Sequence, residues 1–218
     1  MKLDAKTLRI LKNFNDINKS ILIKEGSTLA TMSPTKTVFA KATVVETFNR
    51  TFGIYDLGKF LSVLSLFQDP EITLEENQLV ISKDKNKVKY TYVDPKLIVT
   101  PPEKTIKLPS VDVQFTLSQD TYAAVVKAMS VLALPELAVV GESGQLVLRA
   151  LDSKNPSGDT YDVEIGETDK DFTVIFKADN LKILPGNYNV SVSSKLISHF
   201  AGEGIEYFIA VDAGSKFN

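Results

Sequence analysis

The sequence contains no cysteine and only one histidine among its 218 residues. Thiolate zinc sites, cysteine nucleophiles and histidine-rich catalytic metal sites therefore cannot be built from it. It also lacks a G-x-x-x-x-G-K-[ST] phosphate loop, and its eleven glycines form no G-x-G-x-x-G fingerprint. These absences argue against nucleotide hydrolysis and Rossmann-type redox chemistry. We expect no metal and no cofactor.

Long apolar runs are missing too, so we expect no contact with a membrane. The N-terminus, Met1-Lys2-Leu3-Asp4, leads directly into a charged amphipathic pattern and offers no apolar signal-peptide core. The composition, 44% hydrophobic and 24% charged, is that of a soluble globular protein. We therefore expect a cytoplasmic protein.

Few residues remain that could catalyse a reaction. His199 lies in the run 196–200, where a structural role on a strand or loop is the favoured interpretation. Carboxylates are plentiful, and two acids converging in a pocket would leave the alternative of a carboxylate-dependent hydrolase open. The densest acidic stretch is typical of exposed strand positions and the turn between them: Asp159, Asp162, Glu164, Glu167, Asp169 and Asp171. We expect no catalytic residue.

The first strong element is a helix predicted over 4–18, with Asp4 placed to cap its N-terminus. A spacing of about 100° per residue separates two faces. The apolar face is predicted to carry Leu3, Thr7, Ile10, Leu11, Phe14 and Ile17, and the polar face Lys2, Lys6, Arg9, Lys12, Asn13 and Asp16.

Alternating or β-branched runs predict strands in the rest of the first half, at 21–24, 28–31, 37–45, 51–55, 71–74, 78–83 and 87–93, with a second helix over 56–67. The pattern stops between Asp94 and Pro109, where Pro95, Pro101, Pro102 and Pro109 disfavour both helix and central strand. This segment contains the apolar triplet 97–99, which is unusual in a linker and is expected to pack against something.

The order of elements then repeats. A strand at 113–117 precedes a helix over 118–132, whose apolar stripe is predicted to be Tyr122, Val125, Val126, Met129 and Leu132. Strands follow at 136–140, 145–151, 160–165 and 172–176, a short helix at 178–183, and strands at 187–193, 195–201 and 205–211, before a tail expected to fray. The sequence therefore predicts an α+β protein of two similar domains, 1–94 and 112–218, joined by a connector at 95–111.

Several stretches resemble the DNA polymerase sliding clamps of T4-like bacteriophages, which are related in fold to the eukaryotic and archaeal proliferating-cell-nuclear-antigen clamps. The resemblance spans nearly the whole chain. It is carried by the order and spacing of Leu11-Lys12-Asn13-Phe14 with Ile17-Asn18, Ile54-Tyr55-Asp56-Leu57 with Phe60-Leu61 and Leu64-Ser65-Leu66, Pro185-Gly186-Asn187-Tyr188, and Tyr207 to Asp212.

The resemblance implies a non-enzymatic processivity factor with the DNA clamp fold. Three subunits would close into a ring, with helices lining the inner face and antiparallel sheets outside. The partners implied are duplex DNA, bound topologically and without sequence preference, a DNA polymerase, and an ATP-driven clamp loader. The implied DNA-facing residues are Lys2, Lys6, Arg9, Lys12, Lys59, Lys127, Lys177 and Lys182. Apart from Lys127, the second-half helix offers few basic positions.

Ring closure in this family would join the strand at 87–93 to the strand at 160–165 of the next subunit. The first carries lysines and the second acids, so their charges are complementary. The expected interface residues are Lys87, Lys89, Tyr90, Tyr92, Asp159, Tyr161, Asp162 and Glu164.

Clamps of this family receive a short hydrophobic peptide from a polymerase or loader beside the connector and the C-terminal strand. The candidates are Leu97, Ile98, Val99, Pro185, Phe208 and Val211, which could instead fill the seam between the halves. An adaptor of duplicated α+β domains would share the repeat but would need no basic helix face, and it stays open as a rival function.

Overall fold

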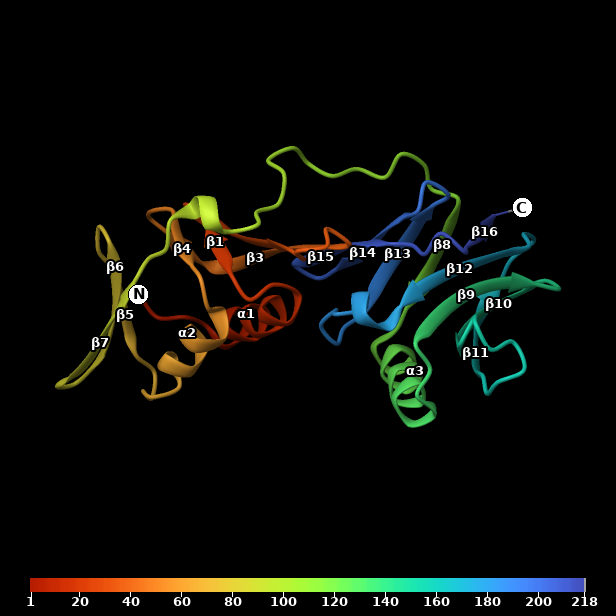
Figure 1. Ribbon diagram of the computed structural model, residues 1–218, viewed down its shortest axis with the longest axis horizontal. Coiled ribbons are helices and arrows are strands. Elements are labelled where there is room, and N and C mark those ends of the chain that lie inside the picture. Colours follow the sequence, from red (N-terminus) through yellow and green to blue (C-terminus); the bar gives the residue numbers. More distant parts are fainter. Residues whose placement is uncertain (218) are drawn as a thin grey trace. The chain divides into compact units, whose positions relative to one another are not determined.

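The computed structural model describes residues 1–217, which divide into two compact units, 1–104 and 105–217 (Figure 1). Every strand pair described within each unit is antiparallel. Within residues 1–217, no helix is both long enough and apolar enough to cross a bilayer.

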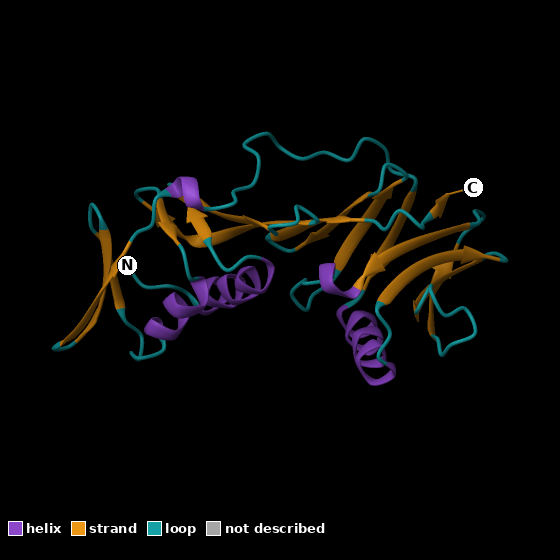
Figure 2. Cartoon of the chain, viewed as in Figure 1, coloured by secondary structure: helices purple, strands orange, loops and turns teal. Residues whose placement is uncertain are grey.

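Unit 1 contains two α-helices that pack against each other, and the first also packs against two antiparallel strands (Figure 2). Strand β1 pairs with β4, β2 pairs with β3, and β5, β6 and β7 form a meander with β7 at its edge. In chain order the elements are α1 (Ala5–Ile17), β1 (Ile21–Ile23), β2 (Gly26–Met32), β3 (Val38–Phe48), β4 (Phe52–Ile54), α2 (Leu57–Leu64), β5 (Glu71–Leu74), β6 (Gln78–Lys83), β7 (Asn86–Thr91) and the 3₁₀ helix η1 (Pro95–Leu97).

Helix α1 begins where the sequence predicts, because the Asp4 carboxylate accepts from the backbone N–H of Lys6. A second carboxylate supports this start from β3. Glu46, which is buried, accepts from the backbone N–H of Asp4 and from the hydroxyl of Thr7, the latter at 2.6 Å. The first turn of α1 is thereby fixed to the sheet by hydrogen bonds as well as by packing.

The apolar stripe of α1 is confirmed, with one correction on the polar face. Thr7, Ile10, Leu11, Phe14 and Ile17 are buried as predicted. Asn13, assigned to the polar face, is 9% exposed and belongs to the buried side. It lies three residues after Ile10, one helical turn along the same face, so the buried arc of α1 is wider than its apolar residues indicate.

Unit 2 has one α-helix and nine strands among its described residues. One sheet has the order β11-β10-β9-β12-β16, with β11 at an edge, and β15, β14, β13 and β8 pair in that order. In chain order the elements are β8 (Val113–Leu117), α3 (Gln119–Leu132), β9 (Glu136–Glu142), β10 (Gln145–Leu151), β11 (Tyr161–Glu167), β12 (Phe172–Lys177), the 3₁₀ helix η2 (Ala178–Asn180), β13 (Tyr188–Ser193), β14 (Ile197–Gly202), β15 (Ile205–Ala210) and β16 (Lys216–Phe217).

The two units share an order of elements. After α1 come four strands, α2 and three strands; after α3 come four strands, η2 and four strands, of which the last, β16, has no counterpart in unit 1. The predicted short helix over 178–183 is wrong beyond its first turn. Leu181 and Ile183 are buried while Lys182 between them is exposed, and this alternation is that of extended chain.

Helix α3 buries a narrower stripe than predicted. Ser118 caps it by accepting from the backbone N–H of Thr121 at 3.1 Å, and Tyr122, Val125 and Met129 are buried. Val126 and Leu132, predicted to share that stripe, are 39% and 38% exposed. The helix contacts only β10 and β11 of its sheet extensively, so it covers one line of side chains rather than a broad face.

The tail does not fray over its described residues. Lys216 pairs with Thr173 and Phe217 with Phe172, and the Ser215 hydroxyl accepts from the backbone N–H of Ile175 at 2.8 Å. Residue 218 lies outside the described residues. The prediction failed because β12 has an edge that needs backbone partners, and two tail residues satisfy it.

Candidate functional sites

The basic face of α1 is exposed along the helix. Lys6, Arg9 and Lys12 recur at intervals of three and are all exposed, on a stripe beside the buried one. Lys2, predicted to belong with them, precedes the helix, and its ammonium is hydrogen bonded to the Asp69 carboxylate. That bond raises the pKa of Lys2 and lowers that of Asp69. The cationic face of α1 therefore consists mainly of Lys6, Arg9 and Lys12.

The remaining predicted lysines are dispersed. Lys59 is exposed in the first turn of α2, which packs beside α1. In unit 2, Lys127 is exposed on α3 and Lys182 follows η2, while Lys177 forms an ion pair with Asp212 at 3.2 Å. Unit 1 thus brings Lys59 to the helix layer that carries the α1 cations, whereas the unit 2 lysines come from three separate elements.

Two sheet edges carry the predicted interface residues. On β7, Lys87 and Lys89 are exposed. Tyr90 and Tyr92 lie on the opposite, packed side: the Tyr90 hydroxyl donates to the Asp56 carbonyl at 3.0 Å with its ring against Phe60, and the Tyr92 ring stacks on Phe52 at 5.0 Å. Burial raises the pKa of both phenols. Their rings help to hold β7 on unit 1.

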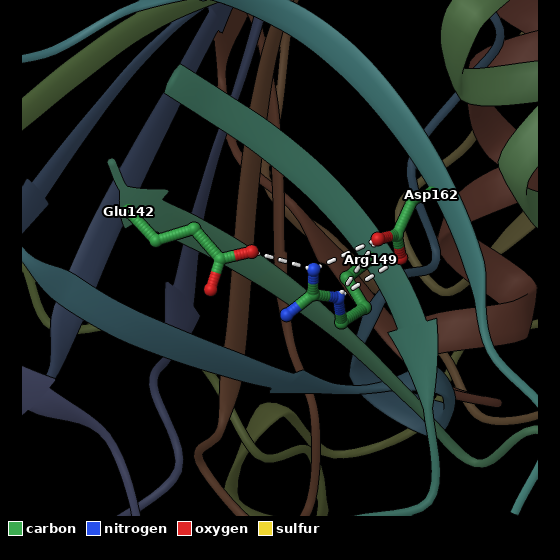
Figure 3. Close-up of polar contacts among 3 residues, drawn as sticks. All are labelled: Glu142, Arg149 and Asp162. Carbon is green, nitrogen blue, oxygen red and sulfur yellow. Dashed lines mark hydrogen bonds and ion pairs between the residues drawn. The ribbon is translucent and has the colours of Figure 1, made fainter. Parts of the chain in front are cut away.

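The acids of the second edge are not all unpaired. On β11, Asp162 accepts from Arg149 of β10 with both carboxylate oxygens, at 2.8 to 3.1 Å, and Arg149 also donates to Glu142 of β9 at 2.7 Å (Figure 3). These carboxylates raise the pKa of the guanidinium. Glu164 accepts from Gln145 at 3.2 Å, and Asp159 lies exposed before the strand. Tyr161 is half-buried.

Arg149 was missed by sequence reasoning although it bridges two acids on the sheet. A signal existed, because Arg149 is the only arginine after residue 112, and it stands within an apolar strand. Alone, that signal could not have identified its partners. Glu142 lies seven residues before Arg149 and Asp162 lies thirteen residues after it. Only the register of β9, β10 and β11 brings all three side chains to one face of the sheet.

The apolar connector triplet divides into one buried and two exposed side chains. Ile98 is 7% exposed and packs over Gly53, where an added Cβ would lie 2.8 Å from the Ile98 Cδ1 atom. Leu97 and Val99 are 65% and 39% exposed. Ile98 thus anchors the connector to unit 1 and leaves its two neighbours accessible.

The other three predicted groove residues lie in unit 2 and differ in exposure. Pro185 is exposed, whereas Phe208 and Val211 are 7% and 6% exposed. The Phe208 ring stacks on the ring of His199 at 4.4 Å, and His199 in turn contacts the Glu206 carboxylate at 2.9 Å. His199 therefore has the structural role expected for it, on strand β14.

All six acids of the 159–171 stretch are exposed, as predicted. Within the described part of the chain, no three histidine, cysteine or acidic side chains are grouped to hold a metal ion. The chemically distinctive surfaces are the basic face of α1, the two charged sheet edges and the exposed connector residues.

Comparisons with known proteins agree along the whole chain. Residues 2–100 match a family described as DNA polymerase processivity factor, and residues 114–213 match one described as gp45 sliding clamp, C terminal. The chain is 34% identical to the sliding clamp of Vibrio phage KVP40 over 98% of this chain and 100% of the relative. It is 29% identical to the sliding clamp of Escherichia phage RB69 over 99% of this chain and 98% of the relative.

A solved PCNA2-PCNA3 complex from Sulfolobus tokodaii includes a chain of similar fold. The TM-score is 0.70 at 13% identity, covering 98% of this chain and 100% of that one.

Proposed function

The chain belongs to the sliding-clamp family of T4-like bacteriophages, and from this premise we propose that three copies close into a ring around duplex DNA. Clamps of this family are non-enzymatic processivity factors. The observation that carries the proposal is similarity to a phage sliding clamp over 98% of this chain and 100% of the relative. In an infected host the ring operates in the cytoplasm.

The basic face of α1 provides the contact with DNA. Lys6, Arg9 and Lys12 present three cations from a rigid helix, and Lys59 adds a fourth from α2. Cations attract phosphates regardless of base sequence, and the attraction weakens with salt. The chain as a whole has a net charge of −2, so retention comes from enclosure rather than tight binding. A weak contact allows the ring to slide.

Strands β7 and β11 provide the contact between copies. Each lies at the edge of its sheet and so has backbone groups without a strand partner in its own unit. A contact of one edge type with the other is heterologous, and such contacts generate a ring when the rotation closes. Lys87 and Lys89 supply positive charge on one edge, and Asp159 and Glu164 negative charge on the other.

The exposed connector residues provide the contact with the DNA polymerase and with the ATP-driven clamp loader. Leu97 and Val99 are apolar and accessible, and Ile98 fixes their position on unit 1. A short hydrophobic peptide would bury both side chains, and removing their apolar surface from water would favour binding.

Release on linearisation tests whether binding is topological. The protein is loaded by a clamp loader with ATP onto nicked circular DNA, free protein is removed, and half of the sample is cut once with a restriction enzyme. We expect protein to remain on the uncut circles and to leave the linear DNA. Equal retention on both would show ordinary binding and overturn the proposal.

A further inference from the structure

The pairing of β7 with β6 defines which residues of β7 direct their backbone N–H and C=O groups to the open edge of the sheet. In the β6-β7 hairpin, Lys83 and Asn86 flank a two-residue turn, and the Tyr92 N–H donates to the Asn77 carbonyl. Backbone hydrogen bonds to β6 therefore come from the even-numbered residues, since bonding alternates along an antiparallel pair. The N–H and C=O groups of Lys87, Lys89 and Thr91 consequently point to the open edge.

The pairing of β11 with β10 likewise defines which residues of β11 direct their backbone groups to the open edge. The Thr168 N–H donates to the Gly144 carbonyl, so the even-numbered residues of β10 form the backbone hydrogen bonds with β11. One of these residues, Leu148, stands opposite Val163. Tyr161 and Val163 thus bond to β10, and the backbone groups of Asp162 and Glu164 point away from it. On both edges, the outward-bonding residues within the strands are the ones with exposed charged side chains, apart from Thr91.

The other faces of the two edge strands are apolar and incompletely covered. Val88 and Tyr90 stand opposite the buried residues Ile81 and Leu79 and are themselves half-buried. Likewise Val163 stands opposite buried Leu148, and it remains half-buried. A strand added at either edge with the correct phase would continue both faces, charged on one side and apolar on the other.

We propose that β7 of one copy adds antiparallel to β11 of the next with Lys89 opposite Asp162 and Lys87 opposite Glu164. This register rests on the proposed ring and specifies its contact. It also sets Thr91 against Thr160. A shift by one residue would place lysines against the Tyr161 and Val163 face.

Shifts by two residues lose one of the two opposite-charge pairs within the strands. One shift leaves Lys87 opposite Gly166, and the other leaves Lys89 opposite Thr160. In the proposed register both charge pairs lie within the spans Asn86–Thr91 and Tyr161–Glu167. Directly opposed unlike charges stabilise antiparallel pairs, so this register is favoured.

Arg149 extends the pairing into a row of alternating charge. Asp162 Oδ2 already accepts from both Nε and Nη2 of Arg149, whereas Oδ1 accepts from Nε alone and has a lone pair for another donor. In the proposed register the row runs from Arg149 through Asp162 to Lys89 of the next copy. The side chains of Lys87 and Lys89 have no ion-pair partner within residues 1–217, and a neighbouring copy would supply one.

Disulfide trapping tests the register, because the natural chain has no cysteine to interfere. The test variant carries Lys87→Cys and Glu164→Cys, which the proposal places directly opposite. Two control variants report the shifted registers: Lys89→Cys with Glu164→Cys, and Lys87→Cys with Asp162→Cys. In the proposed register the control pairs are diagonal, with Cα atoms ~7–8 Å apart, beyond the reach of an unstrained disulfide.

Mild oxidation followed by a non-reducing denaturing gel should give covalent dimers and trimers of the test variant, formed more than about tenfold faster than in either control. Light scattering of the cysteine-free chain reports ring formation independently. A trimer mass combined with faster linkage of a control pair, or with no linkage, would overturn the register and leave the ring intact. A single-chain mass at every concentration, with no linkage, would overturn both.

Discussion

Helices α1 and α3 occupy equivalent positions in the order of elements of the two units, and they differ in the residues on their exposed faces. The exposed face of α1 carries Lys6, Arg9 and Lys12, whereas α3 exposes Lys127 among Ala123, Ala124 and Val126. Their starts differ as well: α1 is fixed by the buried Glu46, and α3 by the exposed Ser118. Equivalent elements in duplicated units can therefore keep their place in the order of elements while their exposed faces differ in charge.

The largest effect is expected at the buried start of α1. Replacing Glu46 by Ala leaves the Thr7 hydroxyl and the Asp4 N–H without their acceptor inside the protein, and we expect a loss of about 3 kcal/mol of unfolding free energy. Urea denaturation measures it. Glu46→Gln, which keeps one acceptor oxygen, is the matched control and should lose less. A loss under about 0.5 kcal/mol for Glu46→Ala would show that the carboxylate does not support α1.

The next largest effect concerns the exposed faces of the two helices. Lys6→Gln, Arg9→Gln and Lys12→Gln together should reduce the slope of log affinity against log salt for duplex DNA by up to about 3, because each lost phosphate contact removes about one unit. Lys127→Gln should reduce it by about 1 at most. Fluorescence anisotropy with a short duplex at several salt concentrations gives both slopes. Equal slopes for the triple variant and the natural chain would exclude α1 as the DNA-contacting face.

A smaller effect is expected at the start of α3. Ser118→Ala removes the acceptor for the Thr121 N–H, which water can replace because the site is exposed, so we expect a cost of about 1 kcal/mol. Ser118→Asp keeps an acceptor and should restore most of it. Thermal melting followed by circular dichroism reports the difference. A cost as large as that of Glu46→Ala would remove the contrast between the two helix starts.

The smallest effect is expected in acid. The Ser110 hydroxyl and the Ser194 N–H lower the pKa of Asp112 in unit 2, and the hydrogen bond from Lys2 lowers that of Asp69 in unit 1. A carboxyl whose folded pKa lies below its ordinary value of 3.8 stabilises the fold above that pH. That stability is lost as the pH falls through the folded value. Asp112→Asn and Asp69→Asn should each flatten this loss below about pH 4.

Salt should affect the stability contributions of Asp69 and Asp112 differently. The Lys2–Asp69 pair is exposed, so 1 M NaCl, where the Debye length is about 3 Å, should remove most of the Asp69 contribution. Asp112 is held by a hydroxyl and a backbone N–H, which salt screens far less. Urea midpoints at pH 3 and pH 6, with and without salt, show whether the two differ. An equal response to salt would mean that Lys170, rather than those hydrogen-bond donors, governs Asp112.

Local patterns in the sequence predicted most of the elements. The limits of α1 followed from Asp4 and an apolar spacing, and the strands from alternation interrupted by glycine and proline. The positions of β7 and β11 at sheet edges have a different origin, because the resemblance, rather than a local pattern, implied that these two strands are open. The element predictions succeeded because helix and strand periodicity depend on residues close together in the chain.

The amino-acid sequence alone was enough to show the absence of cysteine and of nucleotide-binding motifs, the repeated order of elements and the charged runs. Which side chains are accessible and which are paired became clear from the packing of distant segments. This packing buried Asn13, exposed Val126 and Leu132, paired Asp162 with Arg149, and gave the tail a strand partner. Each of these outcomes depends on which distant segment packs beside the residue. The periodicity of a helix or strand determines the direction in which a side chain points, but not the residues that it contacts.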